Sequence, residues 1–207
     1  MYRKIVKPTL DFILALLLII LLLPLMGIVA VVTFIDLGWP LHNLLREREG
    51  KNKKTYIMYK FRTKELDPDG TTRSNTYTKV SRFMDKTRLN ELPQLFNILF
   101  GQMSFVGPRP FIPGESDKFK DIMDPKRYMM KPGLTGLAQI NGGRALTTKE
   151  KIKYDVEYYD NMSLALDVKI VFTTLRRILS FNVDKLNKTE KNNKVKINKK
   201  NSSIFGK

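Results

Sequence analysis

The sequence predicts a mixed α/β, helix-rich protein whose N-terminal segment enters a membrane. Three observations support this prediction: one long uncharged apolar run, several later stretches with apolar residues at helical spacing, and glycine- and proline-rich stretches that leave room for only a few short strands. We expect three parts: a membrane hairpin over 1–40, a domain at the membrane surface over 41–183, and a disordered basic tail over 184–207.

The apolar run from Phe12 to Ile35 contains 24 residues and no charge. Because roughly 20 apolar residues span a bilayer core as a helix, we expect this segment in lipid. Pro24 lies in the middle of the run, and a proline inside a helix removes one hydrogen bond and produces a kink. Two geometries remain, a kinked helix that crosses the bilayer and a helix-break-helix that returns to the same face. Lysine and arginine on both flanks favour the second, re-entrant geometry.

The first half of the following domain contains few regular elements. A basic connection leads into a strand-like stretch over 55–59, and the segment 65–76, rich in Pro, Gly and Asp, is typical of an exposed loop. A helical pattern covers 79–100 with a break near Asn90, which we expect to cap the helix that follows.

The second half of the domain alternates loops and helices. Glycine and proline punctuate 101–114 and 131–144, which we expect to be loops, while 147–161 is charged and helical in pattern. Apolar residues repeat at helical spacing over 164–179. This last helix either packs into the core or lies in the membrane interface as an amphipathic helix, with basic residues toward lipid phosphates. The Lys- and Asn-rich sequence after Asp184 predicts the disordered tail.

The composition excludes several kinds of site. The 207 residues include no cysteine and one histidine, His42, which excludes disulfides, thiolate chemistry and multi-histidine metal sites. Any metal is therefore expected to be a hard cation held by oxygen atoms. The formal charge of +17 is compatible with nucleic-acid binding, but the intramembrane segment argues against that partner.

Three basic clusters have the chemistry of phosphate binding. They are Lys60 with Arg62, the run Lys86–Gln94 followed by Pro108, Arg109 and Pro110, and the run Lys131–Arg144. An arginine between two prolines loses little entropy when its guanidinium binds a phosphate. Glycine-rich loops let backbone amides approach anionic oxygens.

The order of these segments along the chain is similar to that of one known family. The matching segments are the apolar run with its central proline, Tyr59–Arg62, Leu92–Asn97, Met103–Pro110 and Lys131–Gly142. On these residues the chain, from about Met1 to about Ser180, resembles the bacterial sugar transferases, the small monotopic phosphoglycosyl transferases.

The resemblance implies an activity and a setting. Such enzymes transfer a sugar-1-phosphate from a UDP-sugar to a polyprenol phosphate and release UMP, as the first membrane step in making a surface glycan such as an exopolysaccharide or lipopolysaccharide. They use Mg²⁺ and are anchored by a re-entrant helix at the cytoplasmic face of the bacterial inner membrane. The expected partners are a UDP-sugar, a polyprenol phosphate, the lipid bilayer and a second copy of the chain, but no nucleic acid.

The resemblance also implies site residues. Asn90 and Glu91 stand at the catalytic and metal-binding Asp-Glu pair of the family, in which the aspartate attacks the phosphoryl group next to the sugar and becomes an acyl phosphate. The residues expected to contact the substrate are Arg109 with its neighbours Pro108 and Pro110, and Arg88, Lys60, Arg62 and Arg144.

Asparagine at position 90 departs from the family pattern, because a neutral amide cannot form an acyl phosphate. Three explanations are open: an inactivated variant, a natural relative that binds nucleotide sugar or lipid phosphate without turnover, or an enzyme in which another carboxylate, Glu91 or Asp85, takes the role. Asp85 and Arg88 are departures as well, because the family usually has a basic residue at position 85 and a small one at position 88. In the anchor, Leu23 replaces a typical serine.

Overall fold

The structure is a computed structural model that describes residues 1–39, 47–66 and 77–178. The predicted tail and most of the predicted loop over 65–76 lie outside the described residues. The chain divides by its contacts into two units, Met1–Val171 and Phe172–Lys207. The second unit is described only over 172–178, which are helical, and the labelled elements below belong to the first unit.

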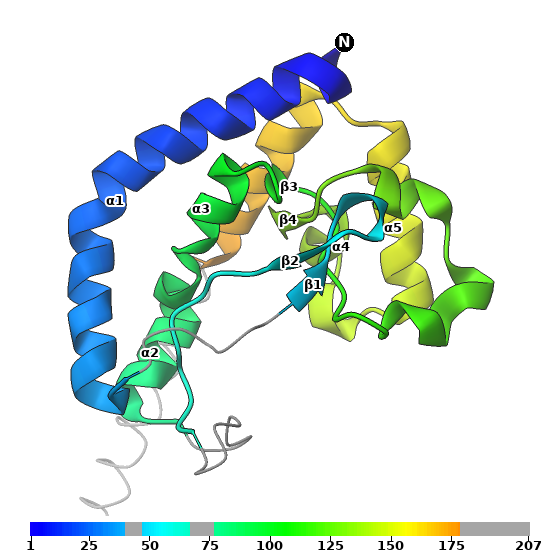
Figure 1. Ribbon diagram of the computed structural model, residues 1–207. Helices are drawn as coiled ribbons and strands as arrows, with labels where there is room; N and C mark the ends of the chain where they lie inside the picture. Colours follow the sequence, from blue (N-terminus) through cyan, green and yellow to red (C-terminus); the bar gives the residue numbers. More distant parts are fainter. Residues whose placement is uncertain (40–46, 67–76, 179–207) are drawn as a thin grey trace, which may run out of the picture. The chain divides into compact units, whose positions relative to one another are not determined.

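A short π-helical turn, η1 (Tyr2–Val6), leads into α1 (Lys7–Leu37), which runs through Pro24 without interruption. Figure 1 shows that α1 bends partway along its length, as expected where a proline removes a backbone hydrogen bond. The predicted helix-break-helix is therefore wrong in one respect, since α1 is one bent helix without a break. Within the described residues, it is the one helix long and apolar enough to cross a membrane.

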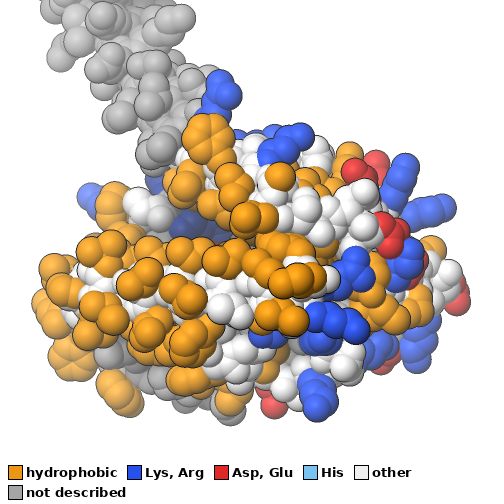
Figure 2. All heavy atoms as spheres, turned by 90° about the horizontal axis from the view of Figure 1, so that it is seen from above, with side chains coloured by type: hydrophobic (Ala, Val, Ile, Leu, Met, Phe, Trp, Pro, Cys, Tyr) orange, Lys and Arg blue, Asp and Glu red, His pale blue; other side chains and the backbone are white. Residues whose placement is uncertain are grey.

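One side of α1 packs against the rest of the unit. Ala15 and Ile19 join Leu95 and Ile98 of α3 (Gln94–Leu99) in the first hydrophobic core. The other side exposes large apolar side chains, which contribute to the broad apolar band in Figure 2. These exposed residues include Phe12, Ile13, Leu17, Ile20, Leu21, Ile28, Val31 and Ile35. A helix with one packed side and one exposed apolar side has a surface suited to lipid.

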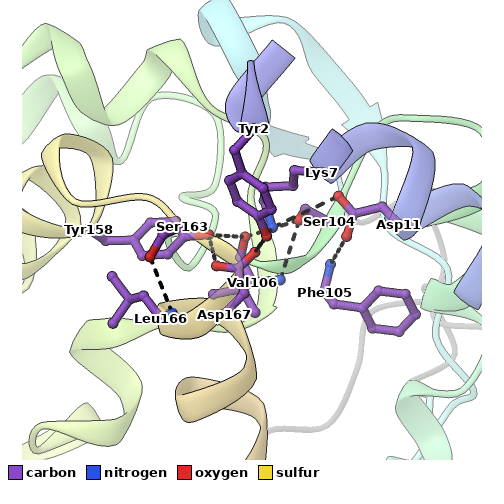
Figure 3. A network of polar contacts seen from close by, with 10 residues as sticks. All are labelled: Tyr2, Lys7, Asp11, Ser104, Phe105, Val106, Tyr158, Ser163, Leu166 and Asp167. Carbon is purple, nitrogen blue, oxygen red and sulfur yellow. Dashed lines mark hydrogen bonds and ion pairs between the residues drawn. The ribbon is translucent and has the colours of Figure 1, made fainter. Parts of the chain in front are cut away.

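The start of α1 is held by a buried polar network. Figure 3 shows Tyr2, Lys7 and Tyr158 converging on Asp167. Lys7 Nζ lies 2.7 Å from Asp167 Oδ2 and 4.0 Å from Asp11 Oδ2. Burial and the neighbouring Asp167 raise the pKa of Tyr158, which keeps its hydroxyl protonated as a donor.

The end of α1 is attached to the same unit. The Arg62 guanidinium donates to the carbonyl oxygens of Leu37 and Gly38, and Thr78 donates to the Asp36 carboxylate. The last carbonyls of a helix lack partners within the helix, so these contacts supply them. Both ends of α1 are therefore fastened to one compact unit.

In the described ranges, four strands of three residues form two two-stranded sheets. β1 (Glu47–Glu49) pairs antiparallel with β2 (Thr55–Ile57) across η2 (Lys51–Lys53), which confirms in part the strand predicted over 55–59. β3 (Ser104–Val106) pairs in parallel with β4 (Gly133–Thr135), inside the two segments predicted as loops. The loop prediction is wrong there because the glycines allow close backbone packing: a Cβ on Gly133 would lie 2.1 Å from the Gly107 nitrogen.

The helical stretch over 79–100 and its break are confirmed. α2 (Lys79–Thr87) is followed by the 3-10 turn η3 (Leu89–Glu91) and by α3. Arg88 makes the break, because its backbone adopts the left-handed conformation at φ 62°. The prediction that Asn90 caps the next helix is wrong, since Asn90 lies inside η3 and Pro93 directly precedes α3.

The remaining labelled elements are η4 (Ser116–Ile122), η5 (Pro125–Met129), α4 (Leu137–Ile140), η6 (Gly143–Ala145) and α5 (Thr148–Asp160). Of these, α4 and α5 contribute to a second core, together with Val106 of β3, Met130 and Ile170. α5 confirms the helix predicted over 147–161 and begins with a capping box of Thr147 and Glu150. Residues 164–178 are helical as predicted, but Leu164 and Val168 of the predicted apolar face are exposed, while Ile170 is buried in this core. The core-packing interpretation is therefore wrong for Leu164 and Val168.

Candidate active site

The arginine-bearing loops meet around one pocket of about 580 Å³. Its charged lining residues are five cations, Arg88, Arg109, Arg127, Arg144 and Lys151, and two acids, Glu115 and Asp155. Three of the cations are predicted phosphate ligands, namely Arg88, Arg109 and Arg144. A pocket of this size holds small-molecule ligands, and the excess of positive charge suits an anionic one.

A buried ion pair holds the loop that carries Arg109. Arg127 Nε donates to Asp155 Oδ2 at 2.8 Å, and Arg127 Nη2 donates to the Arg109 carbonyl oxygen at 2.6 Å. The side chains of Arg127 and Asp155 are 5% and 3% exposed. Burial raises the pKa of Asp155 to about 6, against the opposing effect of Arg127. Sequence reasoning assigns no role to either residue, because the two lie on separate elements and no local pattern links them.

The glycines of the third cluster have two different uses. The Gly133 N–H donates to the Pro108 carbonyl oxygen at 3.0 Å, so this amide binds the segment after β3 and is not free for a phosphate. Gly142 and Gly143 both have positive φ and line the pocket beside Arg144. Gly142 and Gly143 therefore keep the predicted place at a candidate phosphate site, whereas Gly133 does not.

Asn90 is fully buried in η3, with 0% of its surface exposed. Its Nδ2 donates to Asp85 Oδ1, and its backbone carbonyl accepts from the Phe61 N–H at 2.9 Å. Its Oδ1 is buried without a hydrogen-bond partner in the described part of the chain. An unpaired buried amide oxygen is costly, so this atom is a candidate ligand for a cation or for a substrate donor.

Two carboxylates flank the ammonium group of Lys60. Glu91 Oε1 accepts from Arg88 Nη1 at 2.9 Å and lies 3.5 Å from Lys60 Nζ. Asp85 Oδ1 lies 3.8 Å from the same nitrogen. Burial lowers the pKa of Lys60, while Glu91 and Asp85 oppose that shift. Lys60, Asp85, Arg88, Asn90 and Glu91 form what we term the Asn90 cluster, in which two acids balance two cations.

Arg88 connects the Asn90 cluster to the pocket, because it binds Glu91 and also lines the pocket. Pro110 also lines the pocket, whereas Pro108, on the other side of Arg109 in the sequence, is buried and does not line it. The structure thus brings the predicted catalytic pair and most of the predicted phosphate ligands into one neighbourhood.

Arg62 is the exception among the predicted ligands. It is 2% exposed, and its guanidinium donates to the Gly38 carbonyl oxygen at 2.9 Å and to that of Leu37. Its guanidinium is instead used at the carbonyls that end α1, and Arg62 does not line the pocket around Arg109, so its role as a phosphate contact stays a prediction. Its position two residues after Lys60 gives no indication of this use, since the end of α1 lies about 25 residues earlier in the chain.

The oxygen atoms of the Asn90 cluster suit a hard divalent cation. No group of three or more acidic or histidine side chains gathers in the ranges that the structure describes. Mg²⁺ does not need such a cage, because it is commonly held by one or two carboxylates together with substrate phosphates. The orphaned Asn90 Oδ1 and the adjacent carboxylates therefore fit Mg²⁺.

Comparison with known proteins gives consistent matches. The family model for bacterial sugar transferases matches residues 2–181. A UDP-glucose:undecaprenyl-phosphate glucose-1-phosphate transferase of Klebsiella pneumoniae is 36% identical over 179 residues, which are 80% of this chain and 38% of that protein. A UDP-N-acetylgalactosamine-undecaprenyl-phosphate N-acetylgalactosaminephosphotransferase of Aeromonas hydrophila is 36% identical over 193 residues, covering 84% and 44%.

A third relative is of more similar length. The uncharacterized sugar transferase EpsL of Bacillus subtilis is 41% identical over 140 residues, which are 64% of this chain and 67% of that protein. By contrast, this chain spans about two fifths of the length of the glucose-1-phosphate transferases it matches.

Proposed function

Because the chain belongs to the bacterial sugar transferase family, we propose that it transfers a sugar-1-phosphate from a UDP-sugar to a polyprenol phosphate and releases UMP. The names of the Klebsiella and Aeromonas relatives support both substrate classes. No match favours the alternative of a relative that binds without turnover. Within the chain itself, the observation that carries the proposal is the arginine-lined pocket next to the Asn90 cluster.

The pocket has the charge and size for the donor. Arg109 and Arg144 are exposed and line it, so their guanidinium groups are available to a diphosphate. The Arg127–Asp155 pair holds the backbone of Arg109 before any ligand arrives. The loop then loses less conformational entropy when the donor binds, which favours both the affinity for the donor and its orientation.

We further infer that Asp85 supplies the attacking carboxylate in place of Asn90. Relative to the family pattern, the acid has moved from position 90 to 85 and the nearby cation from 85 to 88. Asn90 Nδ2 donates directly to Asp85 Oδ1. The carboxylate at position 85 therefore lies beside the place that a carboxylate at position 90 would occupy. Glu91 is a weaker candidate, because two cations bind it, whereas within the described residues Asp85 forms an ion pair with one cation, Lys60.

The proposed reaction has two displacements at one phosphorus. An Asp85 oxygen attacks the phosphorus next to the sugar, the bond from that phosphorus to the UMP oxygen breaks, and a sugar acyl phosphate remains on Asp85. An oxygen of the polyprenol phosphate then attacks the same phosphorus and releases the carboxylate. Lys60 Nζ lies 3.8 Å from Asp85 Oδ1, and Asn90 Nδ2 donates to the same carboxylate and orients it.

For the cofactor, we propose that Asn90 Oδ1 and Glu91 are the protein ligands of Mg²⁺. The amide oxygen is buried and unpartnered, and the carboxylate lies on the adjacent residue. When bound, the ion neutralises part of the diphosphate charge. A neutral amide is a weaker ligand than a carboxylate, so we expect lower Mg²⁺ affinity than in a variant with aspartate at position 90.

A re-entrant placement of α1 at the cytoplasmic face of a bacterial inner membrane suits this reaction. A crossing helix carries its two ends to opposite sides of a core about 30 Å thick. Here both ends bind one unit, through Lys7 at the start and through Arg62 and Thr78 at the end. The exposed apolar side of α1 then dips into lipid, and a soluble donor meets a lipid acceptor at the surface.

The test is UMP release from a panel of UDP-sugars with undecaprenyl phosphate and Mg²⁺. We expect turnover by the chain, loss of turnover in Asp85→Asn, and its return in Asp85→Asn combined with Asn90→Asp. The matched control is Asp117→Asn, an exposed aspartate paired with Lys120. Intact-protein mass should reveal the sugar-phosphate adduct on the active forms. Full activity of Asp85→Asn refutes the role of Asp85, and absence of UMP release with every donor refutes the function.

A further inference from the structure

A second pocket, of about 400 Å³, lies at the start of α1 and shares no lining residue with the pocket around Arg109. We term it the α1 pocket. Its charged lining residues are all cations: Arg3, Lys4, Lys7, Lys51 and Lys131. They come from η1, α1, η2 and the segment just before β4, so the fold gathers them from three distant parts of the chain.

Two of these cations are held in place without a ligand. Lys7 is buried and bound to Asp167 at 2.7 Å. The Arg3 guanidinium lies 3.8 Å from the centre of the Tyr159 ring and donates to the Tyr159 carbonyl oxygen. An anion that enters the α1 pocket therefore meets preorganised positive charge.

None of the other three cations, Lys4, Lys51 and Lys131, forms an ion pair with an acid in the part of the chain that the structure describes. Burial lowers the pKa of Lys131; Asp11 opposes this shift, whereas Lys51 and Lys7 add to it. Asp167 and Asp11 both lie against Lys7, and the pocket lining contains five cations and no acid, which leaves an excess of positive charge there. Mutual repulsion among these cations is relieved when an anion binds between them.

The apolar part of the lining indicates an amphipathic anion. Methionine side chains (Met129, Met130 and Met162) and Pro8 lie beside the cations. The exposed apolar side of α1 begins shortly afterwards, at Phe12 and Ile13. A ligand with a phosphate at the cations and an apolar part toward α1 matches both features.

We propose that the α1 pocket binds the headgroup phosphate of an anionic membrane phospholipid. The inference rests on the membrane placement of α1 under the proposed function, but not on the transfer reaction. The bound phosphate bridges the start of α1 to Lys51 and Lys131, and so holds this end of the helix at the boundary between lipid and water.

The test measures phosphatidylglycerol binding to the full chain in an uncharged detergent, by titration with native mass spectrometry. We expect one lipid per chain and little binding of phosphatidylcholine. Lys51→Gln with Lys131→Gln should weaken binding about 25-fold, because each lysine near an anionic lipid contributes about fivefold. Lys4→Gln with Lys51→Gln, which changes only exposed side chains, should give a similar loss and excludes a folding effect.

The matched control is Lys149→Gln with Lys153→Gln, which removes the same charge from exposed positions of α5 outside both pockets. It should bind phosphatidylglycerol as the unchanged chain does. Equal weakening in the control, equal binding of phosphatidylcholine, or full displacement by inorganic phosphate or undecaprenyl phosphate at the concentration of the lipid each overturns the proposal. The binding titration contains no UDP-sugar and does not depend on the transfer reaction. A chain that binds the lipid in this titration but releases no UMP in the transfer assay refutes only the proposed function.

Discussion

Replacing Arg127 by methionine tests whether the buried ion pair positions the Arg109 loop. The change removes the 2.8 Å contact with Asp155 and the 2.6 Å contact with the Arg109 carbonyl oxygen. Breaking a buried pair on one side costs about 3–5 kcal/mol. At about 2–4 °C per kcal/mol for a domain of this size, the melting temperature should fall by about 6–20 °C.

The loss of unfolding free energy in Arg127→Met, which we term the deficit, should depend on pH in a defined direction. The pKa of Asp155 is about 6 in the folded protein, above its usual value near 4, so the folded state takes up the proton first as the pH falls. Without Arg127 this pKa rises further, and the variant gains stability by protonation at a higher pH than the unchanged chain. The deficit should therefore shrink between pH 8 and pH 5, by about 1.4 kcal/mol for each unit by which the pKa rises.

The measurements are thermal unfolding in detergent at both pH values and the KM for the UDP-sugar. We expect KM to rise about tenfold, which corresponds to about 1.4 kcal/mol of lost donor binding. Lys126→Met is the matched control, because its pair with Asp160 has the same 2.8 Å distance but is exposed, and exposed pairs contribute at most about 1 kcal/mol. An Arg127 variant as stable as this control, or a deficit equal at both pH values, refutes the reasoning.

Asn90→Asp places a second carboxylate against Asp85, so without Mg²⁺ we expect a loss of about 1–3 kcal/mol that the ion partly restores. Thermal unfolding with and without Mg²⁺ checks this, and an identical loss in both conditions contradicts the metal assignment. Arg62→Met leaves the last carbonyls of α1 unsatisfied, which should lower the free energy of unfolding by about 1–3 kcal/mol without changing KM; a raised KM contradicts the structural role. Because the chain contains no cysteine, single cysteines at Lys4 and Lys54 can be labelled by an impermeant reagent on sealed vesicles. Labelling of both from one side supports the re-entrant helix, and labelling from opposite sides refutes it.

Local patterns predict the elements whose signal lies within a few residues. Helical spacing predicts α5 and the helix over 164–178, and the change of pattern near Asn90 predicts the break between α2 and α3. The short strands β3 and β4 are not predicted, because a strand of three residues has almost no periodicity. Their glycines favour a loop interpretation, although the same glycines permit the parallel pairing.

The packed side of α1 shows a second limit of the sequence. An amphipathic helix reveals its buried side by the contrast between apolar and polar residues. Within the run Phe12–Ile35 this contrast is missing, so nothing local distinguishes buried Ala15 and Ile19 from exposed Leu17 and Ile20. The contact with α3 decides the orientation.

The candidate site divides in the same way. The motif around Arg109 and the departure at Asn90 are visible in the sequence, because each depends on residue types at fixed neighbouring positions. The contact of Asn90 with Asp85, the support of Arg109 by Arg127, and the use of Arg62 at the end of α1 are decided by the fold alone. The reason is physical: adjacent residues are joined by covalent geometry, whereas distant side chains meet only after the packed backbone has brought their elements together.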